Sequence, residues 1–278
     1  MLTEGLIIKV NSDTFTVKYG NLYLDCKARG KNRYIKTKPV VGDKVLIDIE
    51  KKVIEEIKPR DNYLLRPPVS NIDVALIVTS LKKPDINLTL LDKLISIVTI
   101  NNIEPVIVFT KLDLANKDEI KSIKLLSKYY EKIGLKVFTN KKVNKLKKYL
   151  KNKIVTVCGQ TGAGKSTLIN KIDKNLNLDT HEISEALGRG VHTTRIVELF
   201  EVKNFYIVDT PGFSSIDIDN YTKDEIKTSF IEFRGKHCKF NDCTHQKEIG
   251  CSIVQDVENG IILKSRYNNY LKFIKESK

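Results

Sequence analysis

The chain has 278 residues, of which 41% are hydrophobic and 29% charged, with 48 Lys and Arg against 34 Asp and Glu. Such a composition excludes a largely disordered protein, and the length predicts two or three folded domains. The net charge of +14 favours a polyanionic partner such as nucleic acid, although a lysine-rich proteome would also produce it.

The N-terminus indicates where the protein is located. Residues 1–9 lack the basic start, long apolar core and cleavage site of a secretory signal. No apolar run approaches the roughly 18 residues of a membrane span. We therefore expect a cytoplasmic, monomeric protein without a membrane partner.

Residues 1–65 are predicted to form a small β-barrel of the OB-fold type that binds RNA. Apolar runs separated by turn signals predict five short strands, at 5–10, 14–17, 22–26, 45–50 and 53–57. Between the third and fourth, the loop from Lys27 to Lys38 carries six cations and Tyr34 but no acid. Such a loop suits contact with RNA, and a merely solvated loop is the alternative.

Residues 66–220 are predicted to form an α/β domain, after a proline-containing linker at 62–69. Helices are expected at 88–100, 117–133 and 141–150, and strands at 74–79, 105–110, 136–138, 154–158, 196–200 and 205–209. This alternation indicates a mostly parallel sheet covered on both faces. Seven lysines between Lys141 and Lys153 favour a solvated helix face over a second RNA contact.

A base-reading element follows the strand at 105–110. Its residues, Thr110, Lys111, Leu112 and Asp113, read T-K-L-D, close to the N-K-x-D pattern. The Asp113 carboxylate can accept hydrogen bonds from N1–H and the amine of guanine, which adenine does not present, so ATP is disfavoured. Thr110 replaces the usual asparagine and leaves the strength of guanine binding open. Residues 138–140, ending in Asn140, weakly match a second base-contacting loop.

A phosphate-binding loop follows the strand at 154–158. The stretch GQTGAGKST fits the pattern G-x-x-x-x-G-K-[ST] and opens a helix, so that backbone N–H groups face phosphates. We expect Lys165 to reach the β- and γ-phosphates and Ser166 to bind Mg²⁺. The predicted phosphate-contacting residues are Cys158, Gly159, Gln160, Thr161, Gly162, Ala163, Gly164, Lys165, Ser166 and Thr167.

Two elements complete the phosphate side. The strand at 205–209 ends in D-T-P-G, in which Asp209 would support Mg²⁺ and Gly212 would approach the γ-phosphate. The polar segment 187–195 is predicted to be a switch loop that offers Thr193 or Thr194 to Mg²⁺, and the choice between them stays open. These elements come in the order base, phosphate, switch, D-x-x-G, which predicts a circularly permuted fold. Whatever follows Gly212 is then covalently tied to the switch.

Residues 221–278 are predicted to form a zinc-binding and helical domain. Cys238, Cys243, His245 and Cys251 have the spacing C-x4-C-x-H-x5-C. Three thiolates and one imidazole make the closed tetrahedral set of a structural Zn²⁺, one per chain, and buried free cysteines are the alternative. An amphipathic helix is expected at 262–274.

The permuted motifs and the cysteine spacing together resemble the ribosome small-subunit-dependent GTPase family, RsgA or YjeQ. The resemblance rests on TKLD, GQTGAGKST, GRGVHTTR, DTPG and the cysteine cluster. It implies a GTPase that forms GDP and phosphate, binds the 30S subunit late in assembly, contacts 16S ribosomal RNA through its barrel and zinc domain, and is stimulated by the subunit. Thr110 departs from the family pattern.

The catalytic assignment centres on His192. Phe213 stands where many GTPases place a water-orienting glutamine, and a phenyl ring cannot align water. We therefore expect His192 to position the attacking water, and the alternative is that His192 is a surface histidine without a role. Lys165 is expected to stabilise the charge of the transition state. A second hypothesis is a GTP-regulated RNA-binding module whose hydrolysis is incidental to chaperoning ribosomal RNA.

Overall fold

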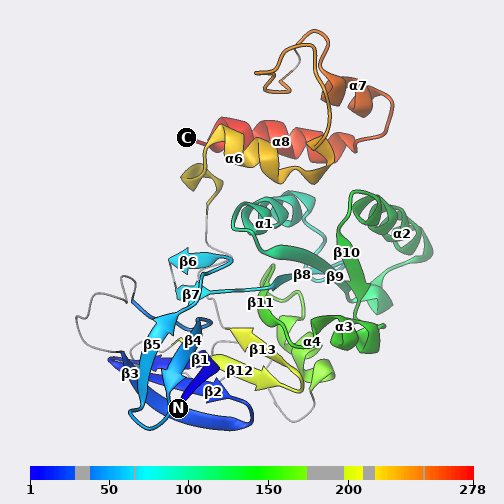
Figure 1. Cartoon of the computed structure of the whole chain (residues 1–278). Coiled ribbons are helices and arrows are strands. Elements are labelled where there is room, and N and C mark those ends of the chain that lie inside the picture. The colour runs from blue at the N-terminus through cyan, green and yellow to red at the C-terminus, as the bar shows by residue number, and fades with distance from the viewer. Residues whose placement is uncertain (29–37, 66, 174–196, 209–216, 247) are drawn as a thin grey trace.

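Five N-terminal strands close into a barrel in the computed structural model, which describes residues 1–28, 38–65, 67–173, 197–208, 217–246 and 248–278 (Figure 1). The strands are β1 (Leu2–Asn11), β2 (Thr14–Tyr19), β3 (Leu22–Ala28), β4 (Lys44–Asp48) and β5 (Val53–Ile57). Their order around the barrel is β1-β2-β3-β5-β4, with β3 parallel to β5. The barrel has its own core, formed by Ile7, Phe15, Val17, Cys26, Val45, Ile47 and Ile54. The predicted OB-type barrel is confirmed.

The stretch predicted as a linker at 62–69 forms a hairpin instead. Its strands are β6 (Tyr63–Leu65) and β7 (Pro68–Ser70). The Asn62 amide closes the hairpin base, because it donates to the Ile72 carbonyl at 2.8 Å and accepts from the Ile72 N–H at 2.9 Å. Pro68 is tolerated because it opens its strand, and Val69 is fully buried.

A six-stranded sheet forms the middle of the molecule. It comprises β8 (Val74–Ser80), β9 (Glu104–Thr110), β10 (Lys136–Thr139), β11 (Ile154–Cys158), β12 (Leu199–Val202) and β13 (Phe205–Val208). The strand order is β10-β9-β8-β11-β13-β12, and among these only the edge strand β12 runs antiparallel to its neighbour. The predicted mostly parallel sheet is confirmed.

Helices cover both faces of this sheet because its strands are apolar on both sides. Helices α1 (Leu88–Ile100) and α2 (Lys117–Lys132) share one buried cluster with it, while α3 (Val143–Leu150) and α4 (Lys165–Ile172) share the other. Asn116 and Glu119 form a capping box that fixes the start of α2.

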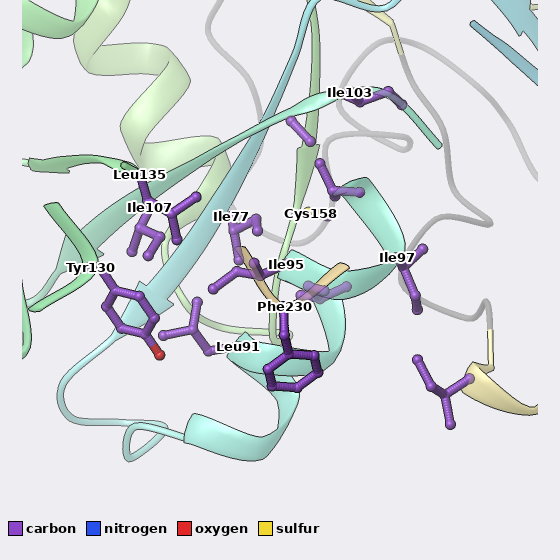
Figure 2. Packing of buried hydrophobic residues seen from close by; sticks show 14 of the residues in the cluster. Ile77, Leu91, Ile95, Ile97, Ile103, Ile107, Tyr130, Leu135, Cys158 and Phe230 are labelled. Carbon is purple, nitrogen blue, oxygen red and sulfur yellow. The ribbon is translucent and has the colours of Figure 1, made fainter. Parts of the chain in front are cut away.

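The C-terminal unit packs against α1. It contains η4 (Ile218–Asn220), α6 (Lys223–Ser229), η5 (Ile231–Phe233), α7 (Ser252–Glu258) and α8 (Lys264–Glu276), so the predicted terminal helix is confirmed. Figure 1 shows α6 and α8 beside α1. Figure 2 shows Phe230 in one cluster with Leu91 and Ile95 of α1 and with Ile77 and Ile107 of the sheet. Packing therefore attaches this unit to α1 as well as to the chain after Gly212.

None of the described helices is long and apolar enough to cross a membrane.

Candidate nucleotide and metal sites

The loop between β11 and α4 is shaped as a cradle for phosphate. Gly159 has φ 130°, and a Cβ there would lie 2.1 Å from the Val78 carbonyl oxygen, so only glycine allows the loop to pass β8 this closely. Gly164 caps α4 with φ 89°. The Lys165 Nζ donates to the carbonyls of Gly159 and Gln160 at 2.9 and 3.1 Å. The ammonium is thus held over the loop, where phosphate oxygens can compete for it.

The side chains of this loop divide into two groups. Those of Cys158, Ala163 and Ser166 are buried, whereas those of Thr161 and Thr167 are exposed. Burial raises the pKa of the Cys158 thiol to about 12, so it stays neutral and packs in the core. Cys158 can therefore offer a ligand only its backbone.

Thr110 joins the base-reading element to the phosphate loop. Its side chain is 2% exposed, and its Oγ1 donates to the Ala163 carbonyl at 2.6 Å. This hydrogen bond links two elements that are 53 residues apart in the chain. The hydroxyl at this position is therefore used in a hydrogen bond inside the protein.

The remaining base-reading residues lie at the same edge of the sheet. Lys111 adopts the left-handed conformation with φ 54°, and η1 (Leu112–Leu114) then presents Asp113 on the surface. The Asn140 N–H donates to the Phe109 carbonyl at 3.0 Å, which sets the second loop beside the first. The buried Asn140 Oδ1 has no hydrogen-bond partner among the described residues. This edge therefore offers the exposed Asp113 carboxylate to a base, while the Asn140 amide oxygen is buried in the loop behind it.

The sequence patterns missed one loop that borders this site. Ser80 ends β8, between the two motif strands, and its Oγ donates to the Pro84 carbonyl at 2.7 Å. Lys111 Nζ donates to the Lys83 carbonyl, and Pro84 Cδ lies 3.5 Å from where a Cβ on Gly162 would be. The position of β8 could have indicated this loop. Ligands bind beyond the carboxyl ends of parallel strands, and β8 ends between β9 and β11.

Five predicted site residues fall outside the part of the chain that the structure describes. They are His192, Thr193, Thr194, Asp209 and Gly212. Most of the basic loop at 27–38 lies outside it as well.

The four predicted metal ligands converge on one point. All their donor atoms lie within 4.8 Å of one another, and Cys243, His245 and Cys251 are buried while Cys238 is half-buried. The Cys238 and Cys251 sulfurs are 3.8 Å apart, and His245 Nδ1 lies 3.5 Å from each of them. Tetrahedral bonds of about 2.3 Å to sulfur and about 2.0 Å to nitrogen require separations of about 3.8 and 3.5 Å. The cluster can therefore bind a metal ion.

Two tyrosines of α8 hold the cluster loop. Tyr267 donates to the His245 carbonyl at 2.8 Å and Tyr270 to the Thr244 carbonyl at 2.5 Å. Such contacts orient a ligand loop before metal arrives.

Comparison with known proteins agrees with this geometry. A family profile described as RsgA GTPase matches residues 57–219, and a profile described as RsgA N-terminal domain matches residues 4–54. Small ribosomal subunit biogenesis GTPase RsgA 2 of Oceanobacillus iheyensis is 43% identical, over 99% of this chain and 97% of that protein. Small ribosomal subunit biogenesis GTPase RsgA of Clostridium perfringens is 41% identical, over 98% and 97%.

Solved structures show the same fold over the whole length. YjeQ from Thermotoga maritima has a TM-score of 0.85 and 33% identity, covering 99% of this chain and 98% of its own. YloQ, described as a circularly permuted GTPase, has a TM-score of 0.83 and 30% identity, covering 99% and 95%. On the matched profile, the full-length relatives and the permuted order of its elements, the chain belongs to the RsgA GTPase family.

Proposed function

We propose that this GTPase binds the 30S ribosomal subunit in the cytoplasm, as a monomer, and hydrolyses GTP during late maturation of the subunit, with turnover stimulated by the subunit. The observation that carries the proposal is the Thr110 bond to Ala163, which sets a guanine-type motif and a phosphate loop on one sheet edge. The names of the curated relatives supply the ribosomal partner.

The residues of the nucleotide site fit GTP in two respects. Asp113 is exposed at the end of β9, and the Asn140 N–H bond to Phe109 holds the second predicted base loop against the same strand. The glycine cradle and Lys165 give phosphates backbone N–H groups and one ammonium. We assign base recognition to Asp113, phosphate binding to 158–167 and transition-state charge to Lys165.

Magnesium would be held by Ser166 and Asp209, with Thr193 or Thr194, and Gly212 would donate to the γ-phosphate. When bound, Mg²⁺ neutralises charge on the β- and γ-phosphates. His192 would orient the attacking water. Ser166 is 5% exposed and lies in the first turn of α4, which suits a ligand beside the cradle.

The metal of the Cys3His cluster is proposed to be zinc. Support comes from the donor set of three thiols and one imidazole, and from the separations among Cys238, His245 and Cys251, which match tetrahedral bonding. The role is then structural. Elemental analysis should find about one Zn per chain, and a folded protein purified without metal would refute the assignment.

We also propose that the domains divide at 1–65, 66–220 and 221–278, with 16S ribosomal RNA contacted by the first and last. Cosedimentation with 30S, 50S and 70S particles in GTP and in GDP tests the partner. Binding to the 30S particle in GTP, and weaker binding in GDP, is expected. Equal binding to all three particles would contradict the proposal.

The catalytic assignment is tested with His192→Ala. We expect GTP binding to be retained and 30S-stimulated turnover to fall about 100-fold, the order that general acid–base and positioning groups supply. Thr110→Val is the matched comparison, since it removes the hydroxyl that bonds to Ala163 and, at 3.5 Å, to Thr79, and it should weaken GTP binding by about ten-fold or less. Unchanged stimulated turnover in His192→Ala would overturn the assignment.

The alternative, an RNA-binding module with incidental hydrolysis, makes a different prediction. Under it, release from the 30S particle is equal with GTP and with a non-hydrolysable analogue. Release with GTP alone supports the GTPase cycle.

A further inference from the structure

A hollow lies between the end of α1, α6 and the metal cluster, away from the nucleotide site. It measures about 550 Å³, within the range of about 300–1,000 Å³ that small-ligand sites occupy. Its lining includes Lys227, Arg234, Lys236, His237, Phe240 and Asn241. We call it the knuckle hollow, since the metal-binding loop forms one wall.

The charge of the knuckle hollow is positive. Lys227, Arg234 and Lys236 line it together with one acid, Glu225. The Glu225 carboxylate already accepts from the N–H and hydroxyl of Thr222, both at 2.8 Å, at the start of α6. The four charged side chains of the lining sum to +2, and a Zn²⁺ held by three thiolates and a neutral imidazole would lower that sum by one.

Arg234, one of the three cations, has no carboxylate partner among the described residues. Lys227 is used inside the protein, because its Nζ donates to the Cys243 carbonyl at 2.9 Å. The Arg234 guanidinium is exposed and makes only long contacts, 3.4 Å, to the Thr228 carbonyl. Lys236 pairs with Asp256 at 2.6 Å but stays exposed. Arg234 is thus the cation best placed to bind a phosphate.

The aromatic ring of Phe240 lines the same hollow. Phe240 is 49% exposed, and Lys239 Nζ lies 5.6 Å from its ring centroid. The Lys239 N–H donates to the Gly250 carbonyl at 3.1 Å, which fixes the loop that carries the ring. An exposed ring on a fixed loop, next to cations, is a platform on which a base can stack.

We propose that the knuckle hollow binds one unstacked nucleotide of a single-stranded RNA, with the phosphate on Arg234 and the base stacked on Phe240. His237 and Asn241 supply polar atoms that can meet base edges. An acidic protein segment would use the cations but would gain little from the ring. The inference rests on the proposed function, since it names the RNA element that the C-terminal unit recognises.

The test uses the zinc-loaded full chain and a short single-stranded RNA that carries 4-thiouridine. Ultraviolet cross-links should map to 236–241, and fluorescence anisotropy should report the affinity. Phe240→Ala is expected to weaken binding about ten-fold, the effect of losing one stacked base. Arg234→Ala should reduce the salt slope by about 0.7, the value for one phosphate of a single strand.

Two matched variants control for general effects. Leu125→Ala removes another exposed apolar side chain, 61% exposed on α2, and Lys272→Ala removes an exposed cation on α8. Both should bind within about two-fold of wild type. Unchanged zinc content in Phe240→Ala and Arg234→Ala shows that the cluster stays folded.

The outcomes separate this inference from the proposed function. If 30S particles stimulate GTP turnover but no cross-link maps to 236–241, or Phe240→Ala binds as wild type, the knuckle hollow is not an RNA site. Poly-glutamate that competes as well as RNA of equal charge would also overturn it. If 30S particles do not stimulate GTP turnover but the cross-links appear, the proposed ribosomal function is wrong and the proposed RNA site in the knuckle hollow is supported.

Discussion

The sheet domain meets its two neighbours through junctions of opposite chemistry. At the C-terminal junction, Arg266 is 1% exposed and its guanidinium binds Asp92 at 2.8 Å and Glu232 at 2.8 and 2.9 Å. Tyr130 donates to the same Asp92 oxygen as Arg266 at 2.7 Å, and Asn269 donates to the other oxygen at 2.6 Å. Burial by itself would lower the pKa of Arg266, but the two carboxylates raise it above its ordinary value. These partners come from α1, α2, η5 and α8, inside a core that the two units share.

The barrel meets edge strand β12 through ion pairs that water reaches. Lys9 pairs with Glu198 at 2.9 Å and Lys18 with Glu201 at 2.6 Å, and the side chains are 15–44% exposed. Figure 1 shows the barrel beside β12 and β13. The barrel has a core cluster of its own, but Leu6, Ile8 and Val10 of β1 also pack against the core that the sheet shares with the C-terminal unit.

Among the described residues, the barrel is anchored to the hairpin by Val41, which packs with Val69 in a buried cluster, and by a polar cluster around Asp43. Asp43 is fully buried and accepts from Arg60 at 2.7 and 2.8 Å and from Ser70 Oγ at 2.7 Å. Exposed ion pairs contribute little stability, whereas breaking a buried and satisfied one is costly. We infer that the barrel seam on β12 can open about this anchor, while the C-terminal unit stays with α1.

Metal removal should have the largest effect on the C-terminal junction. Structural zinc sites contribute apparent free energies of about 10–16 kcal/mol, and Tyr267 and Tyr270 tie this cluster to α8. Treatment with a chelator should therefore expose 221–278 to protease and lower the melting temperature. Protection of the barrel, residues 1–57, serves as the control. A chelated protein with unchanged protease resistance and melting temperature would contradict the prediction.

Arg266→Met is expected to destabilise the protein by about 3–5 kcal/mol in urea unfolding, because it leaves Asp92 and Glu232 buried without their cation. Lys272→Met, on the exposed face of the same helix, should cost about 1 kcal/mol or less. Adding Asp92→Asn and Glu232→Gln to Arg266→Met should recover part of the loss. Equal costs for Arg266→Met and Lys272→Met would show that the junction does not depend on the buried charges.

Substitution of one phenylalanine in each core should show whether the two cores unfold independently. Phe230→Ala and Phe15→Ala should each cost about 3–5 kcal/mol, since both rings are buried. By hydrogen exchange, Phe230→Ala should loosen α1 together with α8, whereas Phe15→Ala should loosen only the barrel strands. Loosening of α1 by Phe15→Ala would mean that the barrel belongs to the same cooperative unit.

The smallest effect is expected at the β12 seam. Glu201→Gln should cost about 0.2–1 kcal/mol, as exposed pairs do. The hydrogen bond from Lys18 lowers the pKa of Glu201 below 4.5, so the stabilisation is complete above pH 4.5 and is lost as the pH falls through the folded-state value. Burial by itself would lower the pKa of Lys18, but its hydrogen bonds to Glu201 and Tyr206 raise the pKa above 10.5 overall. The stability that charged Lys18 contributes is therefore lost only above pH 10.5.

Hydrogen exchange of β12 between about pH 6 and about pH 3 measures this seam. Exchange, corrected for its intrinsic pH dependence, should increase in wild type as Glu201 is protonated. The increase should be smaller in Glu201→Gln, which lacks the Lys18 pair but keeps the Lys9–Glu198 pair. Identical curves for the two proteins would show that the pair does not close the seam.

The sequence by itself determined the chemistry that neighbouring residues perform together. The phosphate loop and the cysteine cluster could be predicted because each gathers its groups from one short segment, and alternating apolar runs predicted the barrel and the parallel sheet. The order of the motifs was enough to predict the permutation.

Only the tertiary structure decided how these parts support one another, because the partners are distant in the chain. The Thr110 hydroxyl looked like a weakened base contact, and folding places it against Ala163, 53 residues away. Arg266 reads as an ordinary helix residue, and its partner Asp92 lies 174 residues earlier. The sequence carries no local signal for such pairs, since the cost of burying each charge is offset only when packing supplies the opposite one.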